Sequence, residues 1–375
     1  MATTNSFLDY HKIVKFLEEQ GVEDIQGVAK EISDNVRAIV TKHKKTAKKI
    51  SEEYREAVPV SEIYPNFDIA VLPCWLKSYS ADLRVLGENT IIISDGRKYQ
   101  LNNKLNDLSG GAWTYFTSSV LNTNYKTKGP DDFAFNIRKI HPSPKPPPLM
   151  RDIVEFFTKE NEIVFDYFMG VGGSLLGASL CGRRSVGIDL NKKYINAYRQ
   201  ASLQLGLSLG KTVCGDSLEL LKDDKFVNKL LEGEKISLIL IDPPYSNMMS
   251  KKKTGADIAI YGNKATPFTN DMRDLGNLDR RDFFDKLKQS VLLASKFLKK
   301  RGYIVIFIKD MQPHKKETNL LHADIIRHIN EIDNISYKGL KIWADQTSKL
   351  FPYGYPFSFV ANQIHQYILI FRKEY

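Results

Sequence analysis

The chain has 375 residues, of which 42% are hydrophobic and 26% are charged, which is typical of a folded globular protein. This composition excludes a collagen-like, fibrous or largely disordered chain. Lysine and arginine (54) exceed aspartate and glutamate (44), and the net charge of +10 favours a polyanionic partner. The three cysteines, Cys74, Cys181 and Cys214, lie far apart, which argues against a disulfide framework or a bound metal.

The sequence gives no indication of a membrane partner. No apolar run reaches the ~18 residues that a transmembrane helix requires. The first residues, MATTNSFLDYHKIVKFLEEQ, lack the apolar core of a signal peptide. We therefore expect a cytoplasmic protein.

Residues 1–132 predict a region of mixed structure. Apolar residues at helical spacing indicate helices over residues 1–58, and residues 42–49 (KHKKTAKK) form a basic patch that is either a solvated helix face or a phosphate-binding surface. Between residues 59 and 130, short β-rich pieces such as Thr90–Ser94 alternate with turns. The aromatic residues of this stretch are expected mainly in the core: they are Trp75, Trp113, Tyr115 and Phe116.

Residues 133–375 predict a second domain. Five prolines in residues 141–148 (HPSPKPPP) indicate an extended connector, because proline disrupts helices and inner strands. Strands then alternate with helices to the end of the chain, which is typical of an α/β fold with a doubly wound, mostly parallel sheet. An antiparallel hairpin is expected at the sheet edge. The seven expected strands are 163–168, 185–190, 211–214, 236–241, 303–308, 336–343 and 366–371, and the expected helices are 149–159, 174–181, 192–205, 217–231, 281–300 and 322–331.

Polar or glycine-rich turns follow the first three of these strands. The first ends in Asp166-Tyr-Phe-Met-Gly-Val-Gly-Gly, where glycines allow the backbone to approach a ligand. The second ends in Asp189, which is well placed to accept hydrogen bonds from a ribose diol. The third ends in Gly215-Asp216-Ser217. Because parallel strands end at one edge of the sheet, these turns predict a nucleoside-containing cofactor. The turn lacks the G-x-G-x-x-G spacing of dinucleotide sites, and the chain has no GxxxxGK[ST] phosphate loop.

The fourth strand runs directly into Asp242-Pro243-Pro244-Tyr245. Two prolines fix the backbone and remove two N–H donors. The Asp242 carboxylate and a proline carbonyl could therefore accept both hydrogens of an exocyclic amino group, and Tyr245 could stack on the base.

Together these motifs resemble the S-adenosylmethionine-dependent amino-methyltransferases of DNA, from about residue 133 to the end of the chain. The resemblance implies a Rossmann-like methyltransferase sheet, S-adenosylmethionine as cofactor and methyl transfer to a base flipped out of the duplex. It implies that Asp242, Pro243, Pro244 and Tyr245 are catalytic. Tyr167 stands where the family usually has proline, and Gly173 where it often has serine or threonine. The predicted cofactor-binding residues are His141, Lys145, Pro146, Asp166, Phe168, Gly170, Gly172, Asp189, Asp216 and Ser217.

The predicted substrate is double-stranded DNA, with adenine N6 favoured over cytosine N4, in a restriction-modification or related system. The one Pro-Cys pair, Pro73-Cys74, precedes the cofactor motif, which argues against cytosine-C5 chemistry. Many related enzymes carry a recognition domain after the last strand, where this sequence stops. We therefore expect recognition to fall to residues 1–132, to loop 246–280 or to a separate specificity or restriction subunit. The predicted DNA-binding residues are Lys251, Lys252, Lys253, Arg273 and Arg280.

Three alternatives stay open. An RNA guanine-N2 methyltransferase shares the order of motifs, and a catalytically inactive nucleic-acid-binding subunit could use the same fold. The intact Asp242 and Tyr245 argue against the second of these. A protein-glutamine methyltransferase would typically have asparagine in place of Asp242. The aromatic segment 351–359 (FPYGYPFSF) is expected either to wall the flipped base or to pack in the core.

Overall fold

The computed structural model describes residues 17–19, 24, 45, 47–126, 128–245, 268–313, 318–348 and 350–375. The chain forms two compact units. One consists of residues 1–103 and 109–111, and the other of residues 104–108 and 112–375. The division therefore falls earlier in the chain than the expected boundary after residue 132. Most of the helices expected within residues 1–46 lie outside the described residues.

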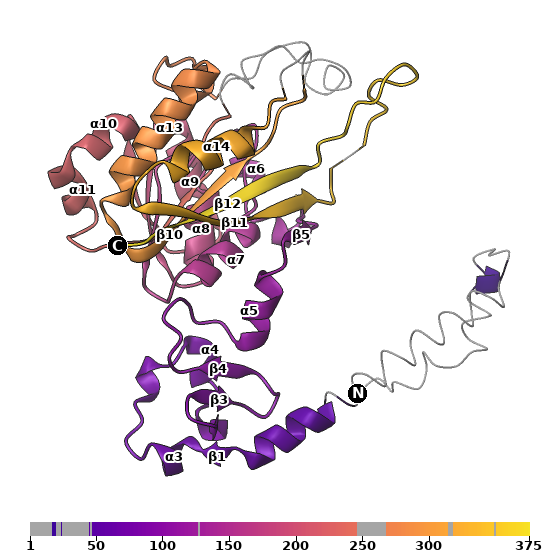
Figure 1. The fold of residues 1–375 in the computed structure, drawn as a ribbon, viewed down its shortest axis with the longest axis vertical. Helices are drawn as coiled ribbons and strands as arrows, with labels where there is room; N and C mark the ends of the chain where they lie inside the picture. Colours follow the sequence, from indigo (N-terminus) through magenta and orange to yellow (C-terminus); the bar gives the residue numbers. More distant parts are fainter. Residues whose placement is uncertain are drawn as a thin grey trace. The chain divides into compact units, whose positions relative to one another are not determined.

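The smaller unit contains a four-stranded antiparallel sheet in the order β1-β2-β3-β4 (Figure 1). Its strands are Val58–Pro59, Arg84–Leu86, Thr90–Ile92 and Lys98–Gln100. Helical residues 47–56 precede β1, and α3 (Val60–Ile63) and α4 (Cys74–Lys77) lie between β1 and β2. Leu76, Ile91 and Ile93 are fully buried in its core. Trp75 packs on this core, as expected of an aromatic core residue, and the guanidinium of Arg97 lies over its ring.

The larger unit is built on an eight-stranded sheet in the order β5-β11-β12-β10-β9-β6-β7-β8 (Figure 1). Strand β12 runs antiparallel to both neighbours, and the other pairings are parallel. The strands in chain order are β5 (Val120–Thr123), β6 (Ile163–Asp166), β7 (Arg184–Asp189), β8 (Lys211–Cys214), β9 (Ile236–Ile241), β10 (Leu298–Ile308), β11 (Ile335–Asp345) and β12 (His365–Lys373).

Helices cover both faces of this sheet because the central strands bury both sets of side chains. In β9, Ile239 and Ile241 face the core that contains α13, whereas Leu238 and Leu240 face the core that contains α7. This is the pattern of a doubly wound fold. The helices are α5 (Gly110–Phe116), α6 (Phe135–Arg138), α7 (Pro147–Phe157), α8 (Gly173–Leu180), α9 (Lys192–Gln204), α10 (Ser217–Lys222), α11 (Asp224–Leu230), α13 (Arg280–Ser295) and α14 (Leu321–Asn330). No helix among the described residues is long and apolar enough to cross a membrane.

The predicted α/β fold with a mostly parallel sheet is confirmed, with two changes in the sheet. An eighth strand, β5, joins it by pairing with β11, and the pairing is parallel. The antiparallel hairpin of β11 and β12 is present, but β5 rather than the hairpin forms that edge. A short edge strand of this kind carries too little hydrophobic pattern to be recognised in the sequence.

Three helix boundaries also differ from the prediction. The helix expected over 217–231 is broken at Asp223, whose side chain accepts hydrogen bonds from the backbone of Lys225 and Phe226 and so starts a second helix. The helix expected over 281–300 ends at Ser295, and β10 already begins at Leu298. The connector 141–148 was expected to contain no helix, yet Pro147 and Pro148 form the first turn of α7, where a missing N–H costs nothing.

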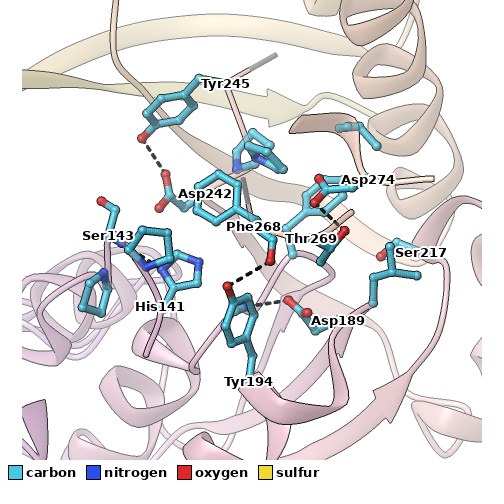
Figure 2. Close-up of a pocket in the computed structure, with 18 of the residues that line it drawn as sticks. His141, Ser143, Asp189, Tyr194, Ser217, Asp242, Tyr245, Phe268, Thr269 and Asp274 are labelled. Atoms are coloured by element: carbon cyan, nitrogen blue, oxygen red, sulfur yellow. Dashed lines mark hydrogen bonds between the residues drawn. The ribbon is translucent and has the colours of Figure 1, made fainter. Parts of the chain in front are cut away.

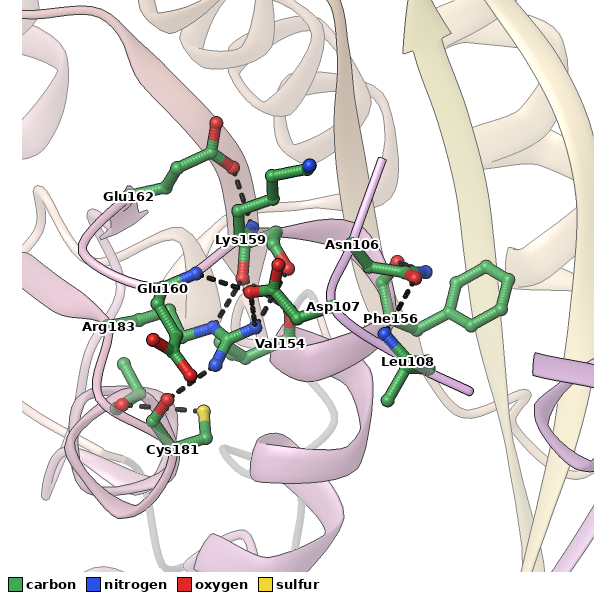
Figure 3. Close-up of polar contacts among 12 residues, drawn as sticks. Asn106, Asp107, Leu108, Val154, Phe156, Lys159, Glu160, Glu162, Cys181 and Arg183 are labelled. Carbon is green, nitrogen blue, oxygen red and sulfur yellow. Dashed lines mark hydrogen bonds and ion pairs between the residues drawn. The ribbon is translucent and has the colours of Figure 1, made fainter. Parts of the chain in front are cut away.

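A buried arginine ties residues 104–108 to the helical layer beside the sheet (Figure 3). The Arg183 guanidinium lies 3.1 Å from the Asp107 carboxylate and also donates to the carbonyls of Thr158 and Cys181. Asn106 donates to the carbonyl of Phe156 at 2.7 Å. Burial raises the pKa of Asp107 against the opposing effect of Arg183, so the pair forms at a desolvation cost.

We predict that Asp107→Ala lowers the free energy of unfolding by about 3–5 kcal/mol, because it leaves a buried guanidinium without its carboxylate. The neighbouring Arg184 provides the control, since its ion pair with Glu234 is about half exposed on both sides. Glu234→Ala should leave the free energy of unfolding nearly unchanged, because solvent screens an exposed ion pair. Urea unfolding of the wild type and both variants measures both effects, and equal losses would contradict a special role for the buried pair.

Candidate active site

A pocket of about 480 Å³ lies where β6, β7, β8 and β9 end (Figure 2). Its wall includes Phe168 and Gly170 after β6, Asp189 at the end of β7, and Asp216 after β8. The four residues Asp242–Tyr245 after β9 line the same pocket. The structure thus brings the predicted cofactor-binding turns and the predicted catalytic turn into one cavity.

The turn after β6 requires glycine at two positions. Gly170 and Gly172 have φ angles of 49° and 72°, a region that other residues rarely adopt. A side chain at Gly172 would also overlap the Tyr198 ring. The backbone of this turn bonds directly to the end of β7, because the Gly170 N–H donates to Asp189 Oδ2 at 2.7 Å.

Asp189 links β7 to this turn. Its second oxygen accepts from the Asn191 backbone at 2.7 Å, so both carboxylate oxygens are anchored by main-chain donors. Burial nevertheless raises its pKa to about 6. Remaining lone pairs of a carboxylate fixed in this way can accept hydrogen bonds from a ribose diol, as the sequence predicted.

Asp166 lies beneath the turn rather than in the main pocket. It is 4% exposed and accepts hydrogen bonds from the Ser174 hydroxyl and the Phe168 N–H. Burial raises its pKa to about 7. Although the sequence placed Asp166 among the cofactor-binding residues, its contacts are those of a residue that supports the turn.

Asp216 and Ser217 line the pocket at the end of β8. Both also have local structural roles. The Asp216 side chain accepts from the Leu218 N–H at 2.9 Å and caps α10, and the Ser217 hydroxyl donates to the Tyr167 carbonyl. The sequence signal at this strand end therefore reflects helix capping as well as a position in the pocket wall.

The proline segment forms another wall of the pocket. His141 is stacked against Phe268 with ring centroids 5.0 Å apart, and its Nδ1 accepts from the Ser143 N–H. Burial lowers the pKa of His141 to about 4, so the imidazole is neutral near pH 7. Pro146 is the residue before α7, and it is not among the described residues that line the pocket.

Lys145 contacts the predicted catalytic turn, although the sequence assigned it to the cofactor. Its ammonium group lies 2.5 Å from Asp242 Oδ2, and its side chain is only 5% exposed. The Tyr245 hydroxyl donates to Asp242 Oδ1 at 2.7 Å. Asp242 is therefore oriented through both oxygens by buried partners.

Tyr245 is more enclosed than a residue that only stacks on a base. It is 9% exposed, and its hydroxyl lies 3.3 Å from the Gln366 side chain as well as against Asp242. Burial and the Asp242 carboxylate raise the pKa of Tyr245 well above its usual value. Its hydroxyl is thus a hydrogen-bond donor that positions Asp242.

Several pocket residues were missed by the sequence analysis: Tyr194, Phe268, Thr269, Asp274 and Gln366. Figure 2 shows Phe268, Thr269 and Asp274 between the Asp242 side and the Asp189 side of the cavity. The Thr269 hydroxyl bonds to Asp274, which in turn caps the short helix Leu275–Asn277. In the sequence, an aspartate two residues before Gly276 is typical of a helix cap, and it could have predicted that this part of the pocket wall is ordered. Gln366 comes from β12, and only the strand order brings it to Tyr245.

The predicted DNA-binding residues fall into two groups. Lys251, Lys252 and Lys253 lie outside the described residues. Arg273 lines the pocket and pairs with Asp271. Arg280, the first residue of α13, pairs with Asp324 of α14. Both arginines are therefore engaged within the chain, and their role in DNA binding stays a prediction. No group of three potential metal ligands occurs in the part of the chain that the structure describes.

The fold and pocket define a class of protein, namely an α/β fold with a doubly wound sheet whose strand ends bring a glycine turn and an Asp-Pro-Pro-Tyr turn into one pocket. The chain belongs to the N6/N4 DNA methylase family, with a match over residues 9–200. This match includes the glycine turn and Asp189 but ends before Asp242. Enzymes of this family depend on S-adenosylmethionine.

Individual relatives match shorter segments. A tRNA (guanine(10)-N2)-dimethyltransferase of Methanocaldococcus jannaschii is 32% identical over 145 residues, which are 37% of this chain and 39% of that protein. The type II methyltransferase M1.MboII of Moraxella bovis is 35% identical over 60 residues, which are 16% of this chain and 23% of that protein. The chain thus spans no more than about two fifths of either relative. A SAM-dependent methyltransferase structure from Agrobacterium tumefaciens overlaps 61% of this chain and 60% of its own, at 15% identity and a TM-score of 0.36.

The residues present fit S-adenosylmethionine, which supplies a methyl group on a positively charged sulfur. The pocket volume lies within the range of about 300–1,000 Å³ that is usual for such ligands. The Asp189 carboxylate offers hydrogen-bond acceptors of the kind that a ribose diol requires, while Phe168 and Leu218 provide apolar wall. His141 is stacked and neutral near pH 7, so it adds no positive charge to a pocket that would hold a cationic sulfur.

We predict that S-adenosylmethionine binding weakens below pH 6, because we expect the ribose hydroxyls to bind the ionised form of Asp189, whose pKa burial raises to about 6. The affinity should fall by up to about tenfold per pH unit below 6 and should level off above about pH 7. Calorimetry between pH 5 and 8 measures this dependence. In Asp189→Asn, the part of the pH dependence that comes from Asp189 should disappear. Any remaining dependence would then come from Asp166, whose pKa is about 7. An identical pH profile in this variant would contradict the assignment.

Proposed function

We propose that this protein transfers a methyl group from S-adenosylmethionine to the exocyclic amino group of a nucleobase in DNA. Adenine N6 is favoured over cytosine N4, and the setting is a restriction-modification or related system. The single observation that carries the proposal is that Asp242–Tyr245 line the same pocket as Gly170, Asp189 and Asp216. Methyl donor and acceptor can then meet without leaving one cavity.

Asp242 is the group placed to bind the amino group. The nitrogen lone pair attacks the methyl carbon while the bond from that carbon to sulfur breaks, and the nitrogen becomes positively charged. A fixed carboxylate stabilises this charge more in the transition state than in the ground state. Its fixation comes from Lys145 and Tyr245, which hold its two oxygens. The carbonyls of the Pro-Pro turn are further possible acceptors, because the two prolines have no N–H groups to donate to them.

The ion pair with Lys145 has a specific consequence for this chemistry. An ammonium group 2.5 Å from Asp242 competes with an incoming amino group for the same carboxylate. A neutral amino group donates an N–H to Oδ2 or Oδ1 alongside the Lys145 or Tyr245 donor. The attraction of the amino group to Asp242 grows as the nitrogen becomes cationic. Lys145 therefore keeps Asp242 paired in the absence of substrate, when a lone buried carboxylate would be costly.

The charge of the chain supports a nucleic acid as substrate. The net charge of +10 is carried by clusters such as residues 42–49 and 251–253. The relatives named M1.MboII and M2.DpnII are type II methyltransferases, which supports DNA. Target recognition is proposed for residues 1–132, for loop 246–280 or for a separate subunit.

A second candidate function is methylation of guanine N2 in tRNA. Its support is specific, because two archaeal tRNA (guanine(10)-N2)-dimethyltransferases match the chain at 32% and 29% identity over 145 and 106 residues. Both functions use the same carboxylate and the same kind of exocyclic amino group. They differ in the nucleic acid that receives the methyl group.

We predict that Asp242→Asn slows methyl transfer by about 10²–10³-fold, the usual effect of removing one fixed electrostatic contact. The measurement is single-turnover transfer of labelled methyl to unmodified genomic DNA and, in parallel, to unmodified bulk tRNA. Label on adenine N6 or cytosine N4 of DNA supports the first function, and label on guanine N2 of tRNA supports the second. A folded Asp242→Asn protein that transfers at the rate of the wild type would overturn this active site.

We predict that Tyr245→Phe slows transfer by about 5–50-fold, because it removes a hydroxyl donor to Asp242 and keeps the ring. If the residue only stacked on the base, this variant would be nearly as active as the wild type. Tyr194→Phe is the matched control, since its hydroxyl donates to the Phe268 carbonyl in the same pocket without touching Asp242. Comparable slowing in both variants would show that the hydroxyl of Tyr245 has no special role.

A further inference from the structure

The loop between β11 and β12 exposes aromatic side chains to an unusual degree. We call residues 350–364 the aromatic loop. Tyr355, Phe357 and Phe359 are 81%, 93% and 92% exposed, and Leu350 is 70% exposed. The sequence analysis expected residues 351–359 to wall the base or to pack in the core, and for Tyr355, Phe357 and Phe359 packing in the core is wrong. Contiguous exposed apolar groups of this kind mark interaction sites.

The aromatic loop has a defined conformation. Phe351 and Asn362 exchange two hydrogen bonds across its base, at 2.9 and 2.8 Å. At its tip, the Gly354 carbonyl accepts from the backbone of Phe357 and Ser358. Gly354 has a φ of 75°, and a side chain there would overlap the Ser358 carbonyl. The exposed rings are therefore carried on a turn that is held by its own hydrogen bonds.

The aromatic loop ends beside the candidate active site. Its last residue is followed after His365 by Gln366, which lines the pocket and contacts the Tyr245 hydroxyl. The Ala361 carbonyl accepts from Gln312, in the segment after β10 that also contributes Lys309 to the pocket. Figure 1 shows the loop extending from β11 and β12 beyond the sheet.

Charge and shape favour nucleobases as the partner of this loop. Residues 346–364 contain no aspartate or glutamate, so nothing in the segment repels a phosphate backbone. A stable contact with a second copy typically involves about 20–30 residues on each partner, more than the 15 residues of the aromatic loop. A pocket that accepts a base from a duplex also leaves neighbouring bases unstacked, and inserted aromatic side chains compensate for this loss.

We propose that the aromatic loop binds the nucleic acid that carries the target base, with Tyr355, Phe357 and Phe359 stacking on unpaired bases next to it. This inference rests on the proposed function and adds a binding surface to it. Stacking of this kind does not depend on base identity, because every base has a flat face. The loop thus contributes affinity and base opening, and sequence recognition belongs to other parts of the chain.

The test compares the full-length wild type with the double variant Phe357→Ala/Phe359→Ala. Fluorescence anisotropy measures binding to a mixed-sequence single-stranded DNA oligonucleotide, to its duplex, and to bulk tRNA, over a range of salt concentrations. We expect the double variant to bind single-stranded DNA about 5–100-fold more weakly. The slope of affinity against salt should stay unchanged, because the lost contacts are not ionic.

Two controls separate stacking from general effects. Leu203→Ala removes an equally exposed apolar side chain, 80% exposed on α9, and should leave affinity unchanged. Phe357→Trp/Phe359→Trp keeps aromatic faces and should retain binding, with the fluorescence of the new tryptophans quenched by the oligonucleotide. Unchanged S-adenosylmethionine affinity in every variant confirms that the larger unit is folded.

The outcomes distinguish this inference from the proposed function. Wild-type affinity in the double variant, alongside normal methyl transfer by the wild type, overturns the loop proposal alone. Loss of a wild-type dimer in sedimentation experiments, with nucleic-acid binding intact, also overturns it in favour of self-association. A wild type that neither binds nor methylates any of these nucleic acids overturns both.

Discussion

The candidate site depends on one constraint of the sheet, namely that β6, β7, β8 and β9 are parallel neighbours. Their carboxyl ends lie at one edge, so four turns that are distant in sequence meet around one pocket. The hydrogen bond from Gly170 to Asp189 is the direct result, because it joins the turns of two adjacent strands at 2.7 Å. Glycine is needed there since the turn bends back toward its neighbour with positive φ angles. The cofactor side of the site follows from this geometry.

The second constraint is electrostatic, and it joins the proline segment to the turn after β9. A buried lysine and a largely buried aspartate are costly to separate, so the pair between Lys145 and Asp242 fixes the segment 141–146 against the Asp-Pro-Pro-Tyr turn. Tyr245 and Gln366 extend the same network to β12. The proposed catalytic carboxylate is thus held directly by Lys145 and Tyr245, and Gln366 supports it through the Tyr245 hydroxyl. Its orientation is set before any substrate binds, as electrostatic catalysis requires.

The two sides of the pocket differ in their chemistry. The Asp189 side offers a carboxylate anchored by two main-chain N–H groups, and such an acceptor suits a polar nucleoside. The Asp242 side offers a carboxylate held by Lys145 and Tyr245, and this acceptor suits an amino group. Phe268, Thr269 and Asp274 also line the cavity, and Phe268 stacks on His141 of the proline segment. The aromatic loop adds an exposed apolar surface near the same edge of the fold, where a nucleic acid would approach.

The sequence by itself determined the α/β class, six of the seven expected strands to within two residues, and the motifs at four strand ends. These features are local, since hydrophobic runs and turn residues act over a few positions. Strand order, the parallel edge strand β5 and the position of Gln366 were decided only by tertiary structure, because they depend on contacts between distant segments. The same reason explains Lys145, which a motif places near the cofactor but which the fold pairs with Asp242. Likewise, composition could not show that Phe357 and Phe359 are exposed, because an aromatic segment between two strands reads the same whether it is packed or projecting.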